Sequence, residues 1–165
     1  MLRFLMLTAL LCTLVNSGFA QTPSSSTTAA CSFQDGRQLS VRHTSDEALL
    51  GKDKLPEGKL WIPGGAPLFL FTEVPLSVGN LEIPVGAYSM YLIPGKGNWT
   101  LVLNKKVTEA EKYDKGQDLA RVSMEIGQLS APEKFAISLG HVAPKQCNMR
   151  IYYGKTGAWA EFKEN

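Results

Sequence analysis

Residues 87–105 read AYSMYLIPGKGNWTLVLNK, and this stretch decides the fold class. Two runs rich in aromatic and branched side chains, 87–93 and 99–105, flank the polar turn Gly95-Lys96-Gly97-Asn98. Aromatic and β-branched residues favour strands, whereas glycine and asparagine favour the tight reversals between antiparallel strands. The stretch therefore predicts a β-hairpin.

The same pattern extends to both sides of this hairpin. Gly79-Asn80 separates short apolar runs at 76–78 and 81–83, which predicts a second hairpin, and Asp35-Gly36 follows a first short strand. Elsewhere apolar side chains recur at every second position, as expected for half-buried strands. They are Leu39, Val41 and His43; Val122, Met124 and Ile126; Phe135, Ile137 and Leu139; and Met149, Ile151 and Tyr153.

About eight to ten short strands at this spacing, with prolines near their ends, predict an all-β fold. The expected architecture is an antiparallel two-layer β-sandwich. One or two short helical turns are expected as connectors, because Thr44-Ser45-Asp46-Glu47 and Thr108-Glu109-Ala110-Glu111 fit capping boxes. Gly51 and Gly116 would end them.

Residues 1–20 have the features of a cleaved secretory signal peptide. Arg3 supplies an early positive charge, an apolar run covers 4–15, and Gly18-Phe19-Ala20 provides small residues for cleavage. The apolar run is shorter than the roughly 20 residues that span a bilayer. We therefore expect export to the periplasm or the extracellular space, with no integral membrane segment in the mature chain.

The remaining 145 residues, 165 minus 20, suffice for a single core. Residues 21–30, QTPSSSTTAA, contain no large apolar side chain and predict a flexible tether. Residues 31–165 are expected to form one β-sandwich domain.

Of the three cysteines, Cys12 lies in the signal peptide, which leaves Cys31 and Cys147 in an oxidising compartment. Paired cysteines are normally bridged there, so we predict a Cys31–Cys147 disulfide. The alternative is two separately buried thiols.

Without Arg3, 16 basic residues stand against 15 acidic ones, a net charge of +1. A near-neutral surface gives no electrostatic reason to expect nucleic acid or an anionic membrane as partner. No catalytic constellation is visible, because the chain has only two histidines, His43 and His141, and lacks a placed nucleophile. Both histidines are expected to be hydrogen-bonded at the rim of strands, and neither a metal site nor a cofactor is expected.

Aromatic side chains are the residues best suited to ligand binding, since they offer flat apolar faces. Trp61 stands beside the loop Pro63-Gly64-Gly65-Ala66-Pro67, and one of the consecutive Tyr152 and Tyr153 must face outward. The candidate ligand-binding residues are Trp61, Tyr113 and Tyr153.

Residues 81–105, LEIPVGAYSMYLIPGKGNWTLVLNK, and 113–122, YDKGQDLARV, closely resemble the exported bacterial family called domain of unknown function 2911. A looser likeness extends from Cys31 to Phe162. The resemblance implies a secreted or periplasmic β-sandwich and assigns no activity.

The chain departs from that family in two polar segments. Family members typically follow the tryptophan at position 61 with arginine and a loop ending in Asn-Glu, where this chain has Ile62 and Ala66-Pro67. They also tend to end with Trp-Glu-Asn-Thr-Arg-Ala, where residues 153–158 read YGKTGA. If the family residues meet in a polar site, most of it has been replaced here, which argues against an enzyme.

We therefore expect an exported, non-catalytic binding module for a carbohydrate, a peptide or an envelope component. Two alternatives stay open. One is a hydrolase-like enzyme with a site spread over loops, and the other is a structural or assembly module that pairs through an exposed strand edge.

Overall fold

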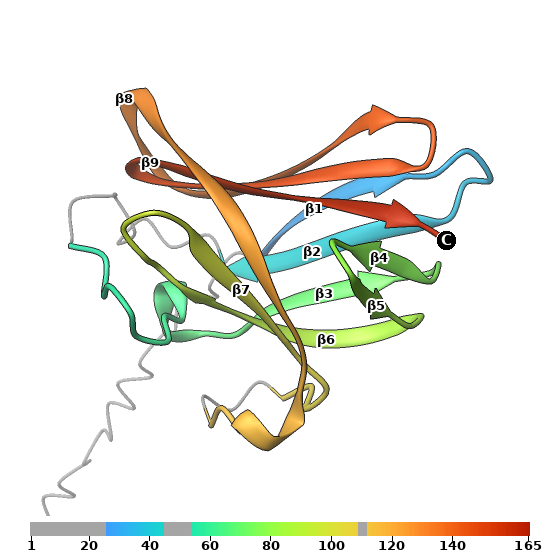
Figure 1. The fold of residues 1–165 in the computed structure, drawn as a ribbon, viewed down its shortest axis with the longest axis horizontal. Helices are drawn as coiled ribbons and strands as arrows, with labels where there is room; N and C mark the ends of the chain where they lie inside the picture. The colour runs from blue at the N-terminus through green and yellow to red at the C-terminus, as the bar shows by residue number, and fades with distance from the viewer. Residues whose placement is uncertain (1–25, 45–53, 109–111) are drawn as a thin grey trace, which may run out of the picture.

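The computed structural model describes residues 26–44, 54–108 and 112–165. Within these ranges the chain consists of strands, loops and two short 3-10 turns (Figure 1). The strands are β1 Ser26–Ser32, β2 Gln38–Thr44, β3 Leu68–Thr72, β4 Leu76–Val78, β5 Leu81–Ile83, β6 Gly86–Ile93, β7 Trp99–Asn104, β8 Asp118–Ala143 and β9 Gln146–Glu164; the turns are η1 Pro63–Gly65 and η2 Lys115–Gln117.

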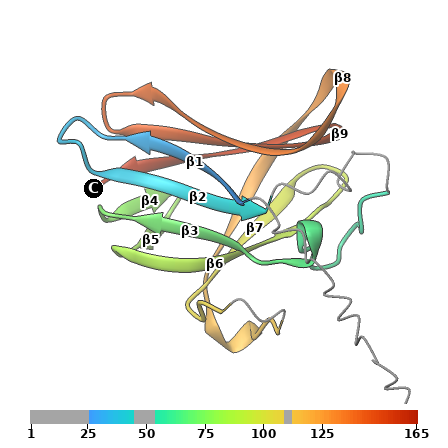
Figure 2. The same ribbon diagram turned by 180° about the vertical axis from the view of Figure 1, so that it is seen from behind.

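The nine strands form one open antiparallel sheet in the order β1-β2-β3-β6-β7-β8-β9-β4-β5. The sheet folds over itself because β8 pairs with β7 up to Met124 and with β9 from Glu125 onward. Figures 1 and 2 both show the tip of the β8–β9 hairpin above β1 and β2. The predicted all-β, two-layer antiparallel fold is confirmed.

Side-chain alternation places one face of each strand in a shared interior. On β2, the side chains of Leu39 and Val41 are fully buried and that of His43 is nearly so. Arg42, between Val41 and His43, is exposed. The apolar interior is continuous through both layers, because a single cluster of buried side chains draws on every strand. Its fully buried members include Leu39, Leu68, Leu70, Leu76, Met90, Leu92, Leu101, Leu103, Met149, Ile151 and Phe162.

The predicted disulfide between Cys31 and Cys147 is confirmed. It joins β1 to β9 with Cα atoms 6.3 Å apart and a sequence separation of 116 residues. Both cysteines are buried, at 4% and 0% exposure. Since β1 and β9 are not neighbours in the sheet, the bond fastens one layer to the other.

The hairpin predictions are confirmed in detail. Residues 76–78 and 81–83 form β4 and β5, and residues 87–93 and 99–105 correspond to β6 and β7 within one residue at each end.

The prediction of short strands throughout is wrong for β8 and β9, which run for 26 and 19 residues. Runs that were expected as separate strands merge, because shifts in register carry the pairing across the polar segments between them. The shift between Gln128 and Glu133 leaves Pro132 without a ladder partner, so its missing N–H costs nothing there. Gly154, with φ of 57°, lies in the bend of β9.

Two predictions about connecting segments change. Residues 26–30, expected as tether, belong to β1 and pair with β2, because backbone hydrogen bonds to an existing strand do not require large side chains. Residues 21–25 of the expected tether and the expected signal peptide at 1–20 lie outside the described residues. So do residues 45–51 of the first expected helical turn and residues 109–111 of the second. In the rest of the second, residues 112–114 are not helical and Gly116 lies within η2, and the other observed turn is η1.

No helix among the described residues is both long and apolar enough to cross a membrane.

Candidate functional site

Two of the three predicted binding residues, Trp61 and Tyr153, meet at one end of the sandwich. The backbone of Trp61 pairs with Leu92, with N–O distances of 2.6 and 3.2 Å. Its indole lies edge-to-face against Tyr153 at 4.9 Å, Phe135 at 5.8 Å and Trp99 at 5.9 Å between ring centroids. His43 lies in turn against Phe135. These five side chains are called the end cluster.

The end cluster is mainly an element of packing. Tyr153 is 4% exposed and Trp99 1% exposed, and only Trp61 is partly open to solvent. Burial lowers the pKa of His43, with a weaker opposing effect from the carbonyl of Thr44. Both segments that depart from the family pattern begin beside this cluster, one after Trp61 and the other at Tyr153.

The third predicted residue, Tyr113, lies elsewhere, with its ring 5.0 Å from that of Tyr91. Its hydroxyl donates to Asp118 Oδ2 at 2.7 Å and accepts from Arg121 Nη2 at 2.7 Å. Asn104 Nδ2 donates to the other carboxylate oxygen of Asp118 at 2.9 Å. Burial tends to raise the pKa of Asp118, but hydrogen bonds from Tyr113, Asn104 and Arg121 outweigh it and hold that pKa below its usual value.

A better-formed site lies on the outer face of β8 and β9. In the antiparallel ladder Glu125 is opposite Trp159, and Gly127 is opposite Gly157, so all four positions share this face. Trp159 Nε1 donates to Glu125 Oε2 at 3.0 Å, which fixes the orientation of the indole. Trp159 is half-buried and keeps part of its surface open to solvent.

The paired glycines make room for aromatic rings over the backbone. A Cβ at Gly127 would lie 3.1 Å from Cη2 and Cζ3 of Trp159. A Cβ at Gly157 would lie 3.3 Å from Leu129 Cδ2 and 3.8 Å from Tyr152 Cδ1. The Trp159 indole therefore rests on Gly127, while Leu129 and one edge of the Tyr152 ring lie beside Gly157. We call this part of the outer face, with Trp159 and Tyr152, the shelf.

Two hollows adjoin this shelf, and both are lined by Trp159 and Glu161. The first, of about 420 Å³, extends toward the β4–β5 turn, and the second, of about 430 Å³, lies in the bend of the hairpin. We call the shelf with its two hollows the outer groove. Polar side chains along it are Asn80, Arg121, Ser123 and Glu125 in the first hollow and Gln128, Asn148 and Arg150 in the second.

Several of these polar groups are held by neighbours. Arg121 Nη2 lies 2.8 Å from Asp118 Oδ2 and donates to the hydroxyl of Tyr113. Tyr113, one of the three predicted binding residues, therefore holds a groove side chain in place. Arg150 Nε donates to Asn148 Oδ1 at 2.8 Å, and Gln146 Nε2 donates to Glu161 Oε2 at 2.8 Å. The groove thus offers oriented donors and acceptors of both charges beside two aromatic faces.

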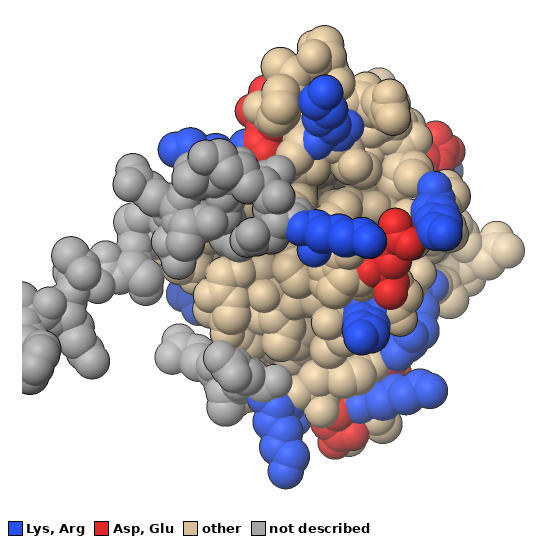
Figure 3. All heavy atoms as spheres, turned by 90° about the vertical axis from the view of Figure 1, so that its left-hand side faces the viewer, with Lys and Arg blue, Asp and Glu red and all other residues tan. Residues whose placement is uncertain are grey.

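Charge is mixed over the neighbouring surface as well. The face of the molecule at the bends of β8 and β9 shows Lys and Arg dispersed among Asp, Glu and uncharged residues (Figure 3). This arrangement agrees with the near-neutral composition and favours recognition by hydrogen bonds and apolar contact over bulk charge.

Sequence reasoning did not single out Trp159, Arg150 or Arg121 as binding residues. The alternation rule correctly required Tyr152 and Tyr153 to face opposite ways, and the structure shows that Tyr153 is the buried one. No local signal marks Trp159, because the glycine beneath its ring, Gly127, lies on the neighbouring strand and not in the sequence around the tryptophan.

No curated protein and no solved structure matches the chain. A family model described as "Protein of unknown function (DUF2911)" matches residues 40–162, which confirms the resemblance seen in the sequence. The chain belongs to this family of proteins of unknown function.

Proposed function

We propose that this protein is an exported, non-catalytic binding module that holds an extended carbohydrate in the outer groove. The observation that carries the proposal is the position of Trp159 between two polar hollows, with its ring supported by Gly127 and its N–H fixed by Glu125. A preoriented ring loses little conformational entropy on binding.

The chemistry of the groove suits sugar rings. A pyranose has an apolar face of C–H bonds and an edge of hydroxyl groups, and it matches a flat aromatic side chain bordered by hydrogen-bonding groups. Trp159 and Tyr152 provide the faces, while Arg121, Asn148 and Arg150 provide donors at the two ends. Because the hollows lie on both sides of Trp159, the groove favours a chain of sugar units over a single one.

The two groove carboxylates, Glu125 and Glu161, raise the alternative of a glycoside hydrolase. A general acid in such enzymes has a pKa raised by burial in an apolar pocket. Here both residues are exposed, and each accepts a hydrogen bond from a neutral donor, Trp159 and Gln146 respectively. This environment supports binding more than hydrolysis.

Export is part of the same proposal. It is supported by the signal-peptide features of residues 1–20 and by the Cys31–Cys147 disulfide, since such bonds persist in oxidising compartments. Carbohydrates of the cell envelope and its surroundings would be accessible there.

The test is a glycan array followed by calorimetric titration of each retained oligosaccharide. Trp159→Ala should weaken binding by about 30-fold, the effect of losing roughly 2 kcal/mol at a central aromatic contact. Incubation of the same oligosaccharides with the protein should release no shorter products.

Phe71→Ala is the matched control, because Phe71 is also a half-buried aromatic residue but lies on β3 against Phe69 and Arg42. It should leave affinity unchanged. The proposal is wrong if Trp159→Ala binds as well as the unchanged protein, or if only peptides are retained. If the unchanged protein released shorter oligosaccharides and Glu125→Gln did not, the protein would instead be a glycoside hydrolase.

A further inference from the structure

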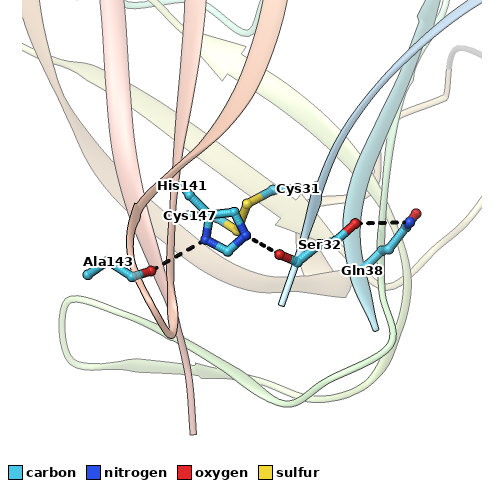
Figure 4. The surroundings of a disulfide bond; sticks show 6 residues. All are labelled: Cys31, Ser32, Gln38, His141, Ala143 and Cys147. Atoms are coloured by element: carbon cyan, nitrogen blue, oxygen red, sulfur yellow. Dashed lines mark hydrogen bonds between the residues drawn. A yellow bond between two sulfur atoms is a disulfide. The ribbon is translucent and has the colours of Figure 1, made fainter. Parts of the chain in front are cut away.

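A second cluster of chemically reactive groups lies at the opposite side of the β8–β9 hairpin tip from the outer groove. His141 on β8 stands directly beside the Cys31–Cys147 disulfide (Figure 4). One ligand atom from each of Cys31, His141 and Cys147 falls within 4.8 Å of the other two. The three come from β1, β8 and β9, so the cluster exists only in the folded protein.

The imidazole is held by backbone groups on both sides. His141 Nδ1 faces the carbonyl of Ala143 at 3.4 Å, and Nε2 faces the carbonyl of Ser32. The ring therefore bridges the hairpin tip and β1 at the same place as the disulfide. This confirms the expectation of a hydrogen-bonded histidine at the rim, and it keeps an imidazole beside the two sulfur atoms.

Two thiolates and an imidazole are the donor set that zinc prefers, and three protein ligands with one open position form a recognised class of zinc site. We propose that Cys31, Cys147 and His141 bind a zinc ion when the disulfide is reduced. The disulfide and the zinc ion are then alternative ways of fastening β1 to β9.

The chemistry balances with an external dithiol as reductant. The dithiol transfers two electrons and two protons to the disulfide, whose S–S bond breaks to give two cysteine thiols, and the reductant becomes a disulfide. Zinc then displaces the two thiol protons to form two Zn–S bonds, while the neutral imidazole donates a lone pair. Reoxidation by a disulfide of the same class releases the ion.

The geometry requires only local movement. Two Zn–S bonds of about 2.3 Å at a tetrahedral angle place the sulfur atoms about 3.8 Å apart. The two Cα atoms are already 6.3 Å apart, so side-chain rotation can supply this separation without moving the strands. His141 must exchange its contact with Ser32 for the metal.

Access is provided on the side of the imidazole. The sulfur atoms are buried, but His141 is exposed and borders a surface hollow with Ser32, Phe33, Gln34 and Pro144. An ion and a water molecule for the open position can enter there. The protein thus encloses the two thiolates and leaves the histidine side toward solvent.

The test is cobalt and zinc titration of the reduced protein under an inert atmosphere. Reduced protein should bind one Co²⁺ with the intense absorption of thiolate-to-cobalt charge transfer and the visible bands of a tetrahedral ion, and zinc should displace it. Oxidised protein should show neither signal. His141→Ala should weaken zinc binding by at least about 10-fold, and Cys147→Ser should remove the two-thiolate signal.

His43→Phe serves as control, because it removes the other histidine while keeping a ring against Phe135. It should bind zinc normally. The reduced chain could unfold, so its circular dichroism is measured with and without zinc. Refolding when zinc is added supports the proposal. Three results would overturn the proposal. The reduced protein could stay folded and bind no zinc, or it could unfold and fail to refold when zinc is added. In the third, reduced His141→Ala would bind zinc as tightly as the reduced unchanged protein.

Discussion

Trp61 and Tyr153 pack against each other in the end cluster, whereas Trp159 and Tyr152 lie on the outer face of the β8–β9 hairpin, beside Gly127 and Gly157. Tyr152 and Tyr153 are consecutive in β9 and differ only in which face of the strand they occupy. The comparison shows that strand parity, more than residue type, decides whether an aromatic side chain holds the fold together or is available to a ligand.

The two regions also differ in what surrounds the rings. In the end cluster the neighbours of Trp61 are the rings of Trp99, Phe135 and Tyr153, so apolar groups surround much of its indole. In the outer groove the neighbours are carboxylate, amide and guanidinium groups held in place by hydrogen bonds. The first arrangement maximises burial, and the second keeps polar groups oriented toward solvent.

The largest expected difference between the two regions is in stability. Tyr153→Ala should lower the free energy of unfolding by about 3–4 kcal/mol, because it opens a cavity in the end cluster. Tyr152→Ala should change it by less than about 1 kcal/mol, as is usual for a side chain on an outer face. Urea unfolding with the disulfide intact measures both, and equal losses would contradict the contrast.

The support behind the groove should show an intermediate effect that depends on pH. Asp118→Asn should cost about 1.5–3 kcal/mol at neutral pH, since Asp118 accepts hydrogen bonds from Tyr113, Asn104 and Arg121. The pKa of Asp118 is below its ordinary value of 3.8 in the folded protein. The stabilisation is therefore complete above pH 3.8 and is lost as the pH falls through the lower, folded value.

Urea unfolding at pH 7 and at several values below 4 checks this behaviour. The gap between the unchanged protein and Asp118→Asn should narrow as the medium becomes more acidic. Glu133→Gln, at an exposed position on β8, should leave the free energy of unfolding at pH 7 unchanged. A gap that stays constant with pH would show that the carboxylate charge does not stabilise this network.

Much of the fold was predictable because its determinants are local. Alternation along β2 and the turns at Gly79-Asn80 and 95–98 are properties of a few neighbouring residues, and they predicted the strands correctly. The disulfide was predictable because Cys31 and Cys147 are the only two cysteines beyond the expected signal peptide.

The site was less predictable because its determinants are not local. The outer groove depends on the bends in β8 and β9, and these follow from register shifts between strands that the spacing of apolar residues does not reveal. The bends bring Arg150 and Asn148 from one part of β9 beside Trp159 and Glu161 from another. Alternation alone established that Tyr152 and Tyr153 face apart, but the bend decides which of them faces the groove.

The smallest change in stability, and the sharpest test of the shelf, is expected from Gly127→Ala. The new methyl group would lie 3.1 Å from two ring carbons of Trp159, which is closer than ordinary van der Waals contact. The indole must therefore move away by a few tenths of an ångström. Trp159 then loses its alignment with Glu125, while stability should change by less than about 1 kcal/mol, because the interior is untouched. Carbohydrate affinity should fall several-fold, and tryptophan fluorescence should shift.

Gly140→Ala separates this effect from the general cost of adding a side chain to β8. Gly140 lies on the same strand, opposite Asn148, and a Cβ there would meet no atom within 4 Å. This variant should keep the fluorescence and affinity of the unchanged protein. If both variants lose affinity equally, the ligand does not recognise the ring over Gly127. If only Gly127→Ala loses affinity, ligand recognition depends on the position of the Trp159 indole, which lies outside the end cluster.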